Sequence, residues 1–427
     1  MSTGPRKPPD RSLQVANGGR TFRHRVASLR LIRRRSVPAV VLFIGLSILF
    51  ASGGASYPVF EAGTAAVDGL FALSVLLALR SVRLCRLKVW LAVLALSYLV
   101  GCGVYAVGWN DTDALDYVQA SKFLWYLLAA LIFSAQRRPV FDPRDVLAFS
   151  RFVLLVFFFA YAVKRLAFGQ DRPVVLVENN FELIFVALLF YATYILSGRI
   201  RVLDLILLGG AVALSGSRSS AIVLVVVIAF CIPFRRFDLR TLLAGVGLLL
   251  VTAIALTIFR GRSEGAIDTV DRYNFLQVFL YATRDWNLAD FLVGSPRLTA
   301  LPPESCHQLA FYERLFSYSG DGRCYSVILH SFNLRVIYDH GLLVFGFCLY
   351  VVWLILRGIP VKARVCVTLV ILLTGMSVSA LNNVYVALAL AFLASSRFSL
   401  PTASRHWSAG VNSANALAPC APSGHLG

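Results

Sequence analysis

Long apolar segments separated by short polar connections dominate the chain. Most of them approach the roughly 20 residues that an α-helix needs to cross the hydrocarbon core of a bilayer. This pattern predicts an all-α polytopic integral membrane protein with about twelve transmembrane helices. The shorter segment at 202–214 is typical of a tilted or broken helix. The apolar segments lie near residues 37–54, 63–80, 89–108, 118–135, 146–168, 181–197, 202–214, 219–233, 241–259, 341–356, 365–380 and 383–396.

The composition supports this interpretation and excludes other classes of protein. Hydrophobic residues make up 58% and charged residues 15% of the 427 positions, and the mean hydropathy is +0.72. A water-soluble chain would carry more charge. Twelve spans of roughly 20 residues would use about 240 residues, which leaves no room for a large soluble catalytic domain. A Rossmann-type nucleotide-sugar enzyme and a P-loop motor are therefore excluded.

Lys and Arg residues are distributed unevenly among the connections. The first 36 residues carry ten of the 41 basic residues, so we expect this segment to remain in the cytoplasm. Alternating sides from there places 27 basic residues in the cytoplasm, 12 outside and two within spans. This bias favours about twelve spans with both termini cytoplasmic. The basic connections expected inside are 80–88, 137–144, 199–201, 235–240 and 357–364.

The spans and the charge bias together predict five parts of the chain. A cleaved signal peptide ending near residues 51–53 is an alternative, but the long basic region and the full apolar segment favour a retained anchor. Contact with anionic membrane lipids explains the net charge of +19, so nucleic acid is not an expected partner. The parts are a basic cytoplasmic N-terminal tail (1–36), transmembrane helices 1 to 9 (37–259), a large outer loop (260–340), transmembrane helices 10 to 12 (341–396) and a cytoplasmic C-terminal tail (397–427).

The large outer loop is the one sizeable part expected outside the membrane. Its segment 271–280 has apolar residues at helical spacing, which predicts an amphipathic helix near the membrane surface. Cys306 and Cys324 are the two of eight cysteines that fall in this loop. In an oxidising compartment they could form a disulfide; two unpaired thiols are the alternative, because sequence does not fix the separation of their Cα atoms.

Metal and cofactor sites are not indicated by the sequence. No cysteine spacing is typical of a metal site. Asp111 and Asp113 are similar to the metal-binding acidic pair of nucleotide-sugar transferases, but no nucleotide-binding domain surrounds them. We therefore expect neither a metal nor another cofactor, and the alternative of a metal site rests on Asp268, Asp271 and Asp285.

The segment 214–220 joins the seventh and eighth predicted spans on the outer side. Gly216 allows a tight turn, and Ser217 or Ser219 can cap the following helix. Arg218 then lies beside a helix N-terminus, a combination that suits phosphate oxygens. The alternative is an arginine whose head group reaches the lipid headgroups.

Arg272 and His330 are two further candidates in the outer loop. A surface salt bridge to Asp268 or Asp271 is the default explanation for Arg272. A histidine just outside a span can exchange a proton near neutral pH, and an interfacial histidine bonded to a neighbour is the alternative. At helical spacing, Asn333 shares a face with His330.

Polar residues also precede the sixth predicted span on the outer side. The carboxylate of Glu178 and the carboxamide of Asn180 suit sugar hydroxyls, although Asn180 can equally cap a helix. Three basic residues near the end of the fifth predicted span run against the charge bias, which is what an anionic ligand on the outer face would require. They are Lys164, Arg165 and Arg172.

In this order, the motifs of residues 170–350 resemble the bacterial O-antigen polymerase and ligase superfamily (Wzy and WaaL type). The features that carry the resemblance are the Asn-containing entry to the sixth span, the Gly-Ser-Arg-Ser turn and the Arg272 segment ending in Phe-Leu-Val-Gly at 291–294. A closing stretch follows, from His330-Ser331 to the glycines at 341 and 346. Ser331 stands where Asn is common, and residues 294–296 lack the usual Gly-x-Gly, which leaves the subfamily open.

The resemblance implies glycosyl transfer at the periplasmic face of the bacterial inner membrane, so the large loop would be periplasmic. The donor would be an undecaprenyl-diphosphate-linked oligosaccharide, and no metal would take part. Arg218 and Arg272 would bind the diphosphate, and His330 would activate or orient the acceptor hydroxyl. Expected partners besides membrane lipids are flippase and chain-length regulator proteins. Further substrate contacts would come from Glu178, Asn180, Arg172, Lys164, Arg165 and Asn333.

Three functions remain open on the sequence. We favour a polymerase of an exopolysaccharide or capsular polysaccharide, which joins lipid-linked repeat units. A ligase that transfers the glycan to lipid A core uses the same donor chemistry. A lipid-linked oligosaccharide flippase or transporter is the alternative from another class; the chain has no internal repeat and gathers its charges on one outer face instead of at mid-membrane, which argues against it.

Overall fold

The computed structural model of the chain divides it into two units, Met1–Ser36 and Val37–Gly427. It describes residues 36–56, 62–83, 85–232 and 271–395, together with the single positions 245, 247, 252 and 253. The predicted N-terminal tail up to residue 35, most of the ninth span, the start of the large loop and the C-terminal tail lie outside the described residues.

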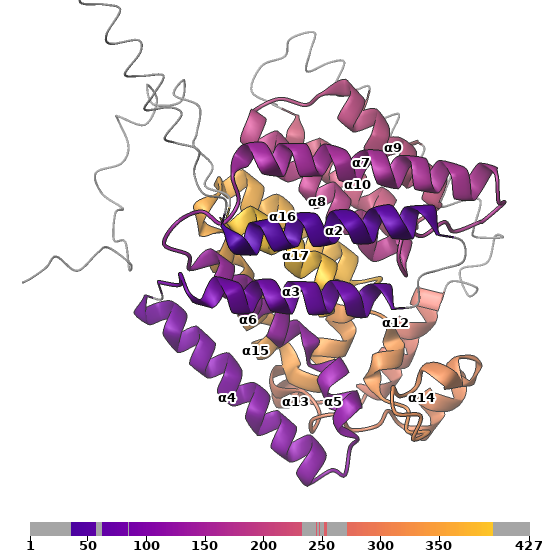
Figure 1. The fold of residues 1–427 in the computed structure, drawn as a ribbon. Coiled ribbons are helices and arrows are strands. Elements are labelled where there is room, and N and C mark those ends of the chain that lie inside the picture. Colours follow the sequence, from indigo (N-terminus) through magenta and orange to yellow (C-terminus); the bar gives the residue numbers. More distant parts are fainter. Residues whose placement is uncertain are drawn as a thin grey trace, which may run out of the picture. The chain divides into compact units, whose positions relative to one another are not determined.

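The described part of the second unit is almost entirely helical (Figure 1). Within it, the backbone forms no strand beyond one antiparallel bridge between Val82 and Gln136. Its α-helices are α2 (Val37–Ala55), α3 (Gly63–Leu79), α4 (Arg86–Gly108), α5 (Ala114–Ala120), α6 (Lys122–Ser134), α7 (Pro143–Leu166), α8 (Asn179–Ser197), α9 (Val202–Ser215), α10 (Arg218–Cys231), α12 (Asp271–Ala282), α13 (Leu288–Val293), α14 (Pro303–Gln308), α15 (Phe332–Ile355), α16 (Val361–Gly375) and α17 (Val384–Ser395). Short 3₁₀ turns are η3 (Ala310–Leu315), η4 (Ser326–Leu329), η5 (Leu356–Gly358) and η6 (Ala380–Asn382).

Among the described residues, five helices are long and apolar enough to cross a membrane. They are α2, α4, α7, α8 and α15 with its η5 extension. A sixth span results if α5 and α6, which meet at a 50° bend, are taken together. The shorter helices α3, α9, α10 and α17 are apolar as well. The described part of the chain is therefore helical with five or six candidate membrane spans, which agrees with the expectation of an all-α membrane protein at this level.

Hydrogen bonds between helix ends of the second unit define two groups of ends. The Lys164 ammonium of α7 donates to the carbonyl oxygen of Gly53 in α2 (2.9 Å), which joins two helix C-termini. At the opposite end, Lys88 of α4 donates to the carbonyl oxygen of Ser134 at the end of α6 (2.7 Å). We call the group of helix ends around Lys164 the loop end, because α12 to η4 lie there. We call the group around Lys88 the basic end, because the connections at 80–88, 137–144 and 357–364 lie there.

Two helices form the centre of the packing. The apolar window of α8 is 72% buried, against 28–44% for the other candidate spans, and all but one of the residues of α17 are buried. Both sequences are apolar on every side, which is typical of a helix surrounded by other helices. By contrast, α4 exposes a row of large apolar side chains, including Trp90 at 71% exposure, a face suited to lipid.

The second half of the large loop packs around a small core of its own. Phe275 and Phe279 of α12 are buried against Ile328 and Leu329 of η4. The predicted helix at 271–280 is thus confirmed as α12, and its apolar side faces protein. The buried carboxylate of Asp116 in α5 accepts hydrogen bonds from the Ser319 hydroxyl (2.5 Å) and from the Tyr318 backbone N–H. These contacts fix the loop against α5.

A backbone kink in α15 receives the chain that follows α13. Gly341 has φ 74° and Gly294 has φ 84°, and an added Cβ at Gly341 would overlap the carbonyl of Leu292. The backbone N–H of Ser295 donates to the carbonyl oxygen of Tyr338 just before the kink (2.7 Å). Gly294 ends the motif at 291–294, and Gly341 belongs to the closing stretch that begins at His330. Their backbones therefore touch, which only glycine permits.

We predict that Gly341→Ala destabilises the protein. A positive φ costs a non-glycine residue on the order of 1–3 kcal/mol, and the overlap with Leu292 adds to it. Gly346→Ala is the matched control, because its Cβ would meet nothing within 4 Å. The thermal midpoint of the purified protein in detergent should fall for Gly341→Ala and stay or rise for Gly346→Ala. Equal midpoints for the two variants would contradict the close approach.

Candidate functional site

A buried carboxylate organises the connection that leads into α8. Glu182 is fully buried and accepts hydrogen bonds from the backbone N–H groups of Val175 (2.9 Å), Leu176 (2.7 Å) and Val177 (2.9 Å). The Tyr161 hydroxyl of α7 donates a fourth (3.1 Å). A buried carboxylate needs such donors, so this arrangement holds the connection against α7 and α8. It thereby positions Glu178 and Asn180 at the start of α8.

Asn180 links this connection to the turn before α10. The Ser217 hydroxyl donates to the carboxamide oxygen of Asn180 (2.6 Å), and the Asn180 amide donates to a carboxylate oxygen of Glu178 (2.7 Å). Ser217 is also the N-cap of α10, since its hydroxyl accepts from the Ser220 N–H (3.2 Å). The expected turn at Gly216 (φ 59°) and the cap at Ser217 are confirmed. Asn180 lies inside α8 after its N-cap Glu178, so the alternative that it caps this helix is wrong.

The two arginines assigned to the diphosphate come together at this turn. Arg218 is the first residue of α10, and its side chain is only 9% exposed. The Arg272 guanidinium of α12 donates to the Ser219 hydroxyl (3.2 Å) and to the carbonyl oxygen of Ser377 (3.3 Å). Asp268 and the Asp271 side chain, the predicted salt-bridge partners of Arg272, lie outside the described residues. We call the group formed by Asn180, Ser217, Arg218, Ser219, Arg272 and Ser377 the serine–arginine cluster.

Ser377 is a member of this cluster that the sequence analysis missed. It follows the end of α16, and its hydroxyl forms a hydrogen bond with that of Ser219 (3.0 Å). The apolar pattern assigned this position to a span, and nothing in the pattern distinguishes it. Glu182 was missed too, although a carboxylate inside an otherwise apolar segment is a signal of function or of a specific partner.

His330 precedes α15, and its ring lies next to α12. Its side chain is exposed, and its ring centroid is 5.8 Å from that of Phe275, which follows Arg272 by one helical turn. Its φ of 45° is in the left-handed region, and such strain in a non-glycine residue is often found at functional sites. One short helix thus carries Arg272 on one turn and supports His330 on the next.

Asn333 does not share a helix face with His330, and that prediction is wrong. The helix α15 begins at Phe332 with Ser331 as its N-cap, so His330 precedes it. The Asn333 amide donates to the carbonyl oxygen of Leu372 (3.0 Å), and the Ser331 hydroxyl donates to that of Gly375 (2.9 Å). Both side chains fasten α15 to α16, and Asn333 is only 6% exposed. The structure therefore gives Asn333 a packing role.

The three basic residues at the end of α7 and just after it have different surroundings. Lys164 is 3% exposed, and its ammonium is held by the carbonyl oxygens of Gly53 and Val174 (2.7 Å to Val174). Arg165 forms an exposed ion pair with Asp171 (2.8 Å). The Arg172 guanidinium donates weakly to the Asn179 carboxamide oxygen (3.4 Å). Of the three, Arg172 alone contacts the segment that borders the serine–arginine cluster, and Lys164 is used to join helix ends.

Cys306 and Cys324 are neighbouring thiols, and the expected disulfide is not formed. The Cys306 thiol donates to the carbonyl oxygen of Leu301 (3.5 Å) and contacts that of Cys324 (4.0 Å). The hydrogen bond between the two side chains lowers the pKa of Cys306 and raises that of Cys324. The loop is held here by its apolar core and by hydrogen bonds, so a covalent link is not what maintains the fold.

Asp113, one of the two acidic residues compared with a metal-binding pair, has a structural role. Asp113 caps α5 by accepting from the Leu115 N–H (2.7 Å). Among the described residues, no group of three or more His, Cys, Asp or Glu side chains is arranged to hold a metal ion.

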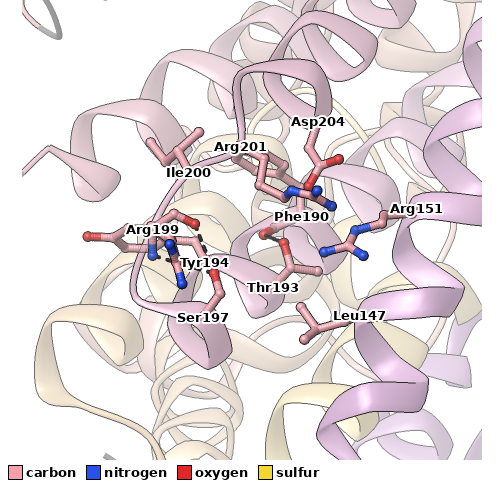
Figure 2. A pocket seen from close by; sticks show the side chains of 10 residues that line it. All are labelled: Leu147, Arg151, Phe190, Thr193, Tyr194, Ser197, Arg199, Ile200, Arg201 and Asp204. Carbon is pink, nitrogen blue, oxygen red and sulfur yellow. Dashed lines mark hydrogen bonds between the residues drawn. The ribbon is translucent and has the colours of Figure 1, made fainter. Parts of the chain in front are cut away.

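Figure 2 shows a small pocket at the other end of α8. Arg151, Arg199, Arg201 and Asp204 lie around it, and its internal volume is about 10 Å³. That is room for about one water molecule. Because it is too small for a sugar or a diphosphate and belongs to the basic end, it is not part of the candidate site.

The candidate site is therefore the serine–arginine cluster together with Glu178, which bonds to Asn180, and Arg172, which bonds to Asn179. His330 packs against Phe275, one helical turn from Arg272. No protein-family model matches the chain, and a search of curated proteins finds no significant similarity. The chemical interpretation rests on the residues and their geometry.

We predict that Ser217 and Asn180 stabilise the site cooperatively. Ser217→Ala removes a helix cap worth about 1 kcal/mol together with the bond to Asn180. A double-mutant cycle with Asn180→Ala should give a coupling of roughly 0.5–3 kcal/mol in the free energy of unfolding in mixed micelles. A second cycle that combines Ser217→Ala with Ser197→Ala, at the other end of α8, is the control. Additive effects of Ser217→Ala and Asn180→Ala would show that the bond does not hold the site.

Proposed function

We propose that the protein is a membrane glycosyltransferase, a polysaccharide polymerase that joins undecaprenyl-diphosphate-linked oligosaccharide repeat units. The observation that carries this proposal is the bond from Arg272 to Ser219 (3.2 Å). It brings the guanidinium of α12 against the first turn of α10, which begins with Arg218. Two arginines at a helix N-terminus suit the two phosphates of a lipid-linked donor better than a neutral ligand.

In this proposal the loop end faces the periplasm of a bacterial inner membrane, and the basic end and both tails face the cytoplasm. About twelve helices then cross the bilayer, the ninth of them within 241–259. Support comes from the grouping of helix ends and from the basic connections that share one end. The donor lipid reaches the cluster from the membrane, since the cluster lies where helices end.

The arginines act on the leaving group. When the glycosidic bond to the diphosphate breaks, negative charge develops on the departing phosphate oxygen. Guanidinium groups already held in place stabilise that charge without a costly rearrangement. Ser219 and Ser377 keep the Arg272 guanidinium fixed, and the dipole of α10 adds to the positive potential near Arg218.

His330 acts on the acceptor. The incoming sugar hydroxyl is a weak nucleophile, and a neutral imidazole nitrogen that accepts its proton during attack assists the reaction. The exposed ring of His330 is supported by Phe275, one turn from Arg272 on α12. Asn180, Glu178 and Arg172 line the approach, where carboxamide and carboxylate oxygens accept hydrogen bonds from sugar hydroxyls.

A strain without the protein distinguishes the proposal from its alternatives. For a polymerase, we expect the polymer to be lost while single lipid-linked repeat units remain on the periplasmic side, as gel electrophoresis of the glycolipids would show. A ligase would instead leave long lipid-linked chains that are not transferred to lipid A core, and a flippase would leave repeat units in the cytoplasmic leaflet. Either pattern would contradict the polymerase assignment.

Variants of Arg218 test the diphosphate site itself. We predict that Arg218→Ala lowers the rate of polymer formation by about 10²–10³-fold at unchanged protein abundance, since it removes charge stabilisation of the leaving group. Arg218→Lys should retain part of the rate if point charge suffices and little if bidentate geometry is needed.

Arg284→Ala is the matched control for this experiment. Arg284 is another cationic residue of the loop end, but it is exposed and paired with Asp285 (3.2 Å). Rates should be measured with purified protein and lipid-linked repeat units. A normal rate for Arg218→Ala, or equal losses for Arg218→Ala and Arg284→Ala, would remove Arg218 from the site.

A further inference from the structure

The basic end contains a cavity of about 420 Å³. It lies between the start of α4, the end of α6 with the connection that follows, the end of α15 with η5, and the end of α17. This volume falls within the roughly 300–1,000 Å³ of ligand-binding pockets. The cavity shares no residue with the serine–arginine cluster, and it is at the opposite end of the helices.

Three cationic side chains line this cavity. They are Lys88, Arg138 and Arg357, and none of the described residues around the cavity is acidic. Arg357 is near enough to Lys88 for their charges to repel. Lys88 is anchored by the carbonyl oxygen (2.7 Å) and the hydroxyl (3.1 Å) of Ser134, neither of which carries charge. Within the described part of the chain, none of the three forms an ion pair. Like charges gathered around a cavity create a positive potential that attracts an anion.

The rest of the lining is divided between hydrogen-bonding and apolar groups. Ser134 and Gln136 belong to the polar part, and Leu87, Phe133 and Leu354 to the apolar part. A soluble anion would gain nothing from the apolar side chains, whereas an amphiphile would use both. The position also fits, because basic pockets between helix ends at one membrane surface are suited to anionic lipid headgroups.

We infer that this cavity binds the phosphate of an anionic phospholipid. The headgroup phosphate lies among Lys88, Arg138 and Arg357, and the beginning of an acyl chain lies against Leu87, Phe133 and Leu354. The inference is independent of the proposed glycosyl transfer, since it concerns other residues at the other end of the helices. It assigns one defined lipid site to three basic residues, whereas the net charge alone indicates only general contact with anionic lipids.

Native mass spectrometry of the full-length protein released from nanodiscs tests this inference. The probes are phosphatidylglycerol, phosphatidylcholine and inorganic phosphate, each titrated separately. We expect phosphatidylglycerol to bind more tightly than phosphatidylcholine, and inorganic phosphate at millimolar concentration not to displace it. In the double variant Arg138→Gln/Arg357→Gln, the apparent affinity for phosphatidylglycerol should fall by about 10- to 30-fold.

Arg80→Gln/Arg144→Gln is the matched control, because it removes two exposed charges from the same end outside the cavity. Its affinity for phosphatidylglycerol should stay within about twofold of the parent protein. Equal losses in both double variants would mean that general surface charge attracts the lipid, and would overturn the site. Equal binding of both lipids, or full displacement by inorganic phosphate, would overturn the lipid assignment. Thermal midpoints of both variants establish that each is folded.

Discussion

A helix in a bilayer satisfies its own backbone polar groups, so polar chemistry in such a protein is confined to places where helices end or break. The loop end follows this constraint. Helices α8 and α10 begin there and α16 ends there, and their terminal residues Asn180, Ser217 and Ser377 supply the hydrogen bonds that fix Arg272 and the turn before Arg218. Glu182 lies in the first turn of α8 and accepts hydrogen bonds from three backbone N–H groups of the preceding connection.

Sequence alone predicts the parts of the fold that depend on local pattern. Every apolar segment that falls within the described residues coincides with a helix, and Gly216 and Ser217 adopt the turn and cap that their chemistry indicates. Hydropathy does not register the 50° bend between α5 and α6, because the predicted apolar segment at 118–135 runs through it. The positive φ of His330 separates it from α15 and from Asn333, a break that helical spacing cannot anticipate.

The site is less predictable than the fold because its contacts join distant parts of the chain. Ser377 reaches Ser219 across 158 positions, and no local signal marks it. Lys164 has the charge expected of a ligand-binding residue, yet its partners are backbone carbonyls of α2 and of the connection before α8. For Cys306 and Cys324, sequence places both thiols in one loop but does not determine whether their sulfur atoms approach in bonding geometry.

The central claim is that Arg218 and Arg272 together hold a polyprenyl diphosphate at the loop end. Its most direct test is an experimentally determined structure of the protein in lipid nanodiscs with undecaprenyl diphosphate. The account predicts density for the two phosphates between the guanidinium groups of Arg218 and Arg272, with the polyprenyl chain leading into the membrane. Diphosphate density at any other position, with these two side chains in contact only with protein, would contradict it.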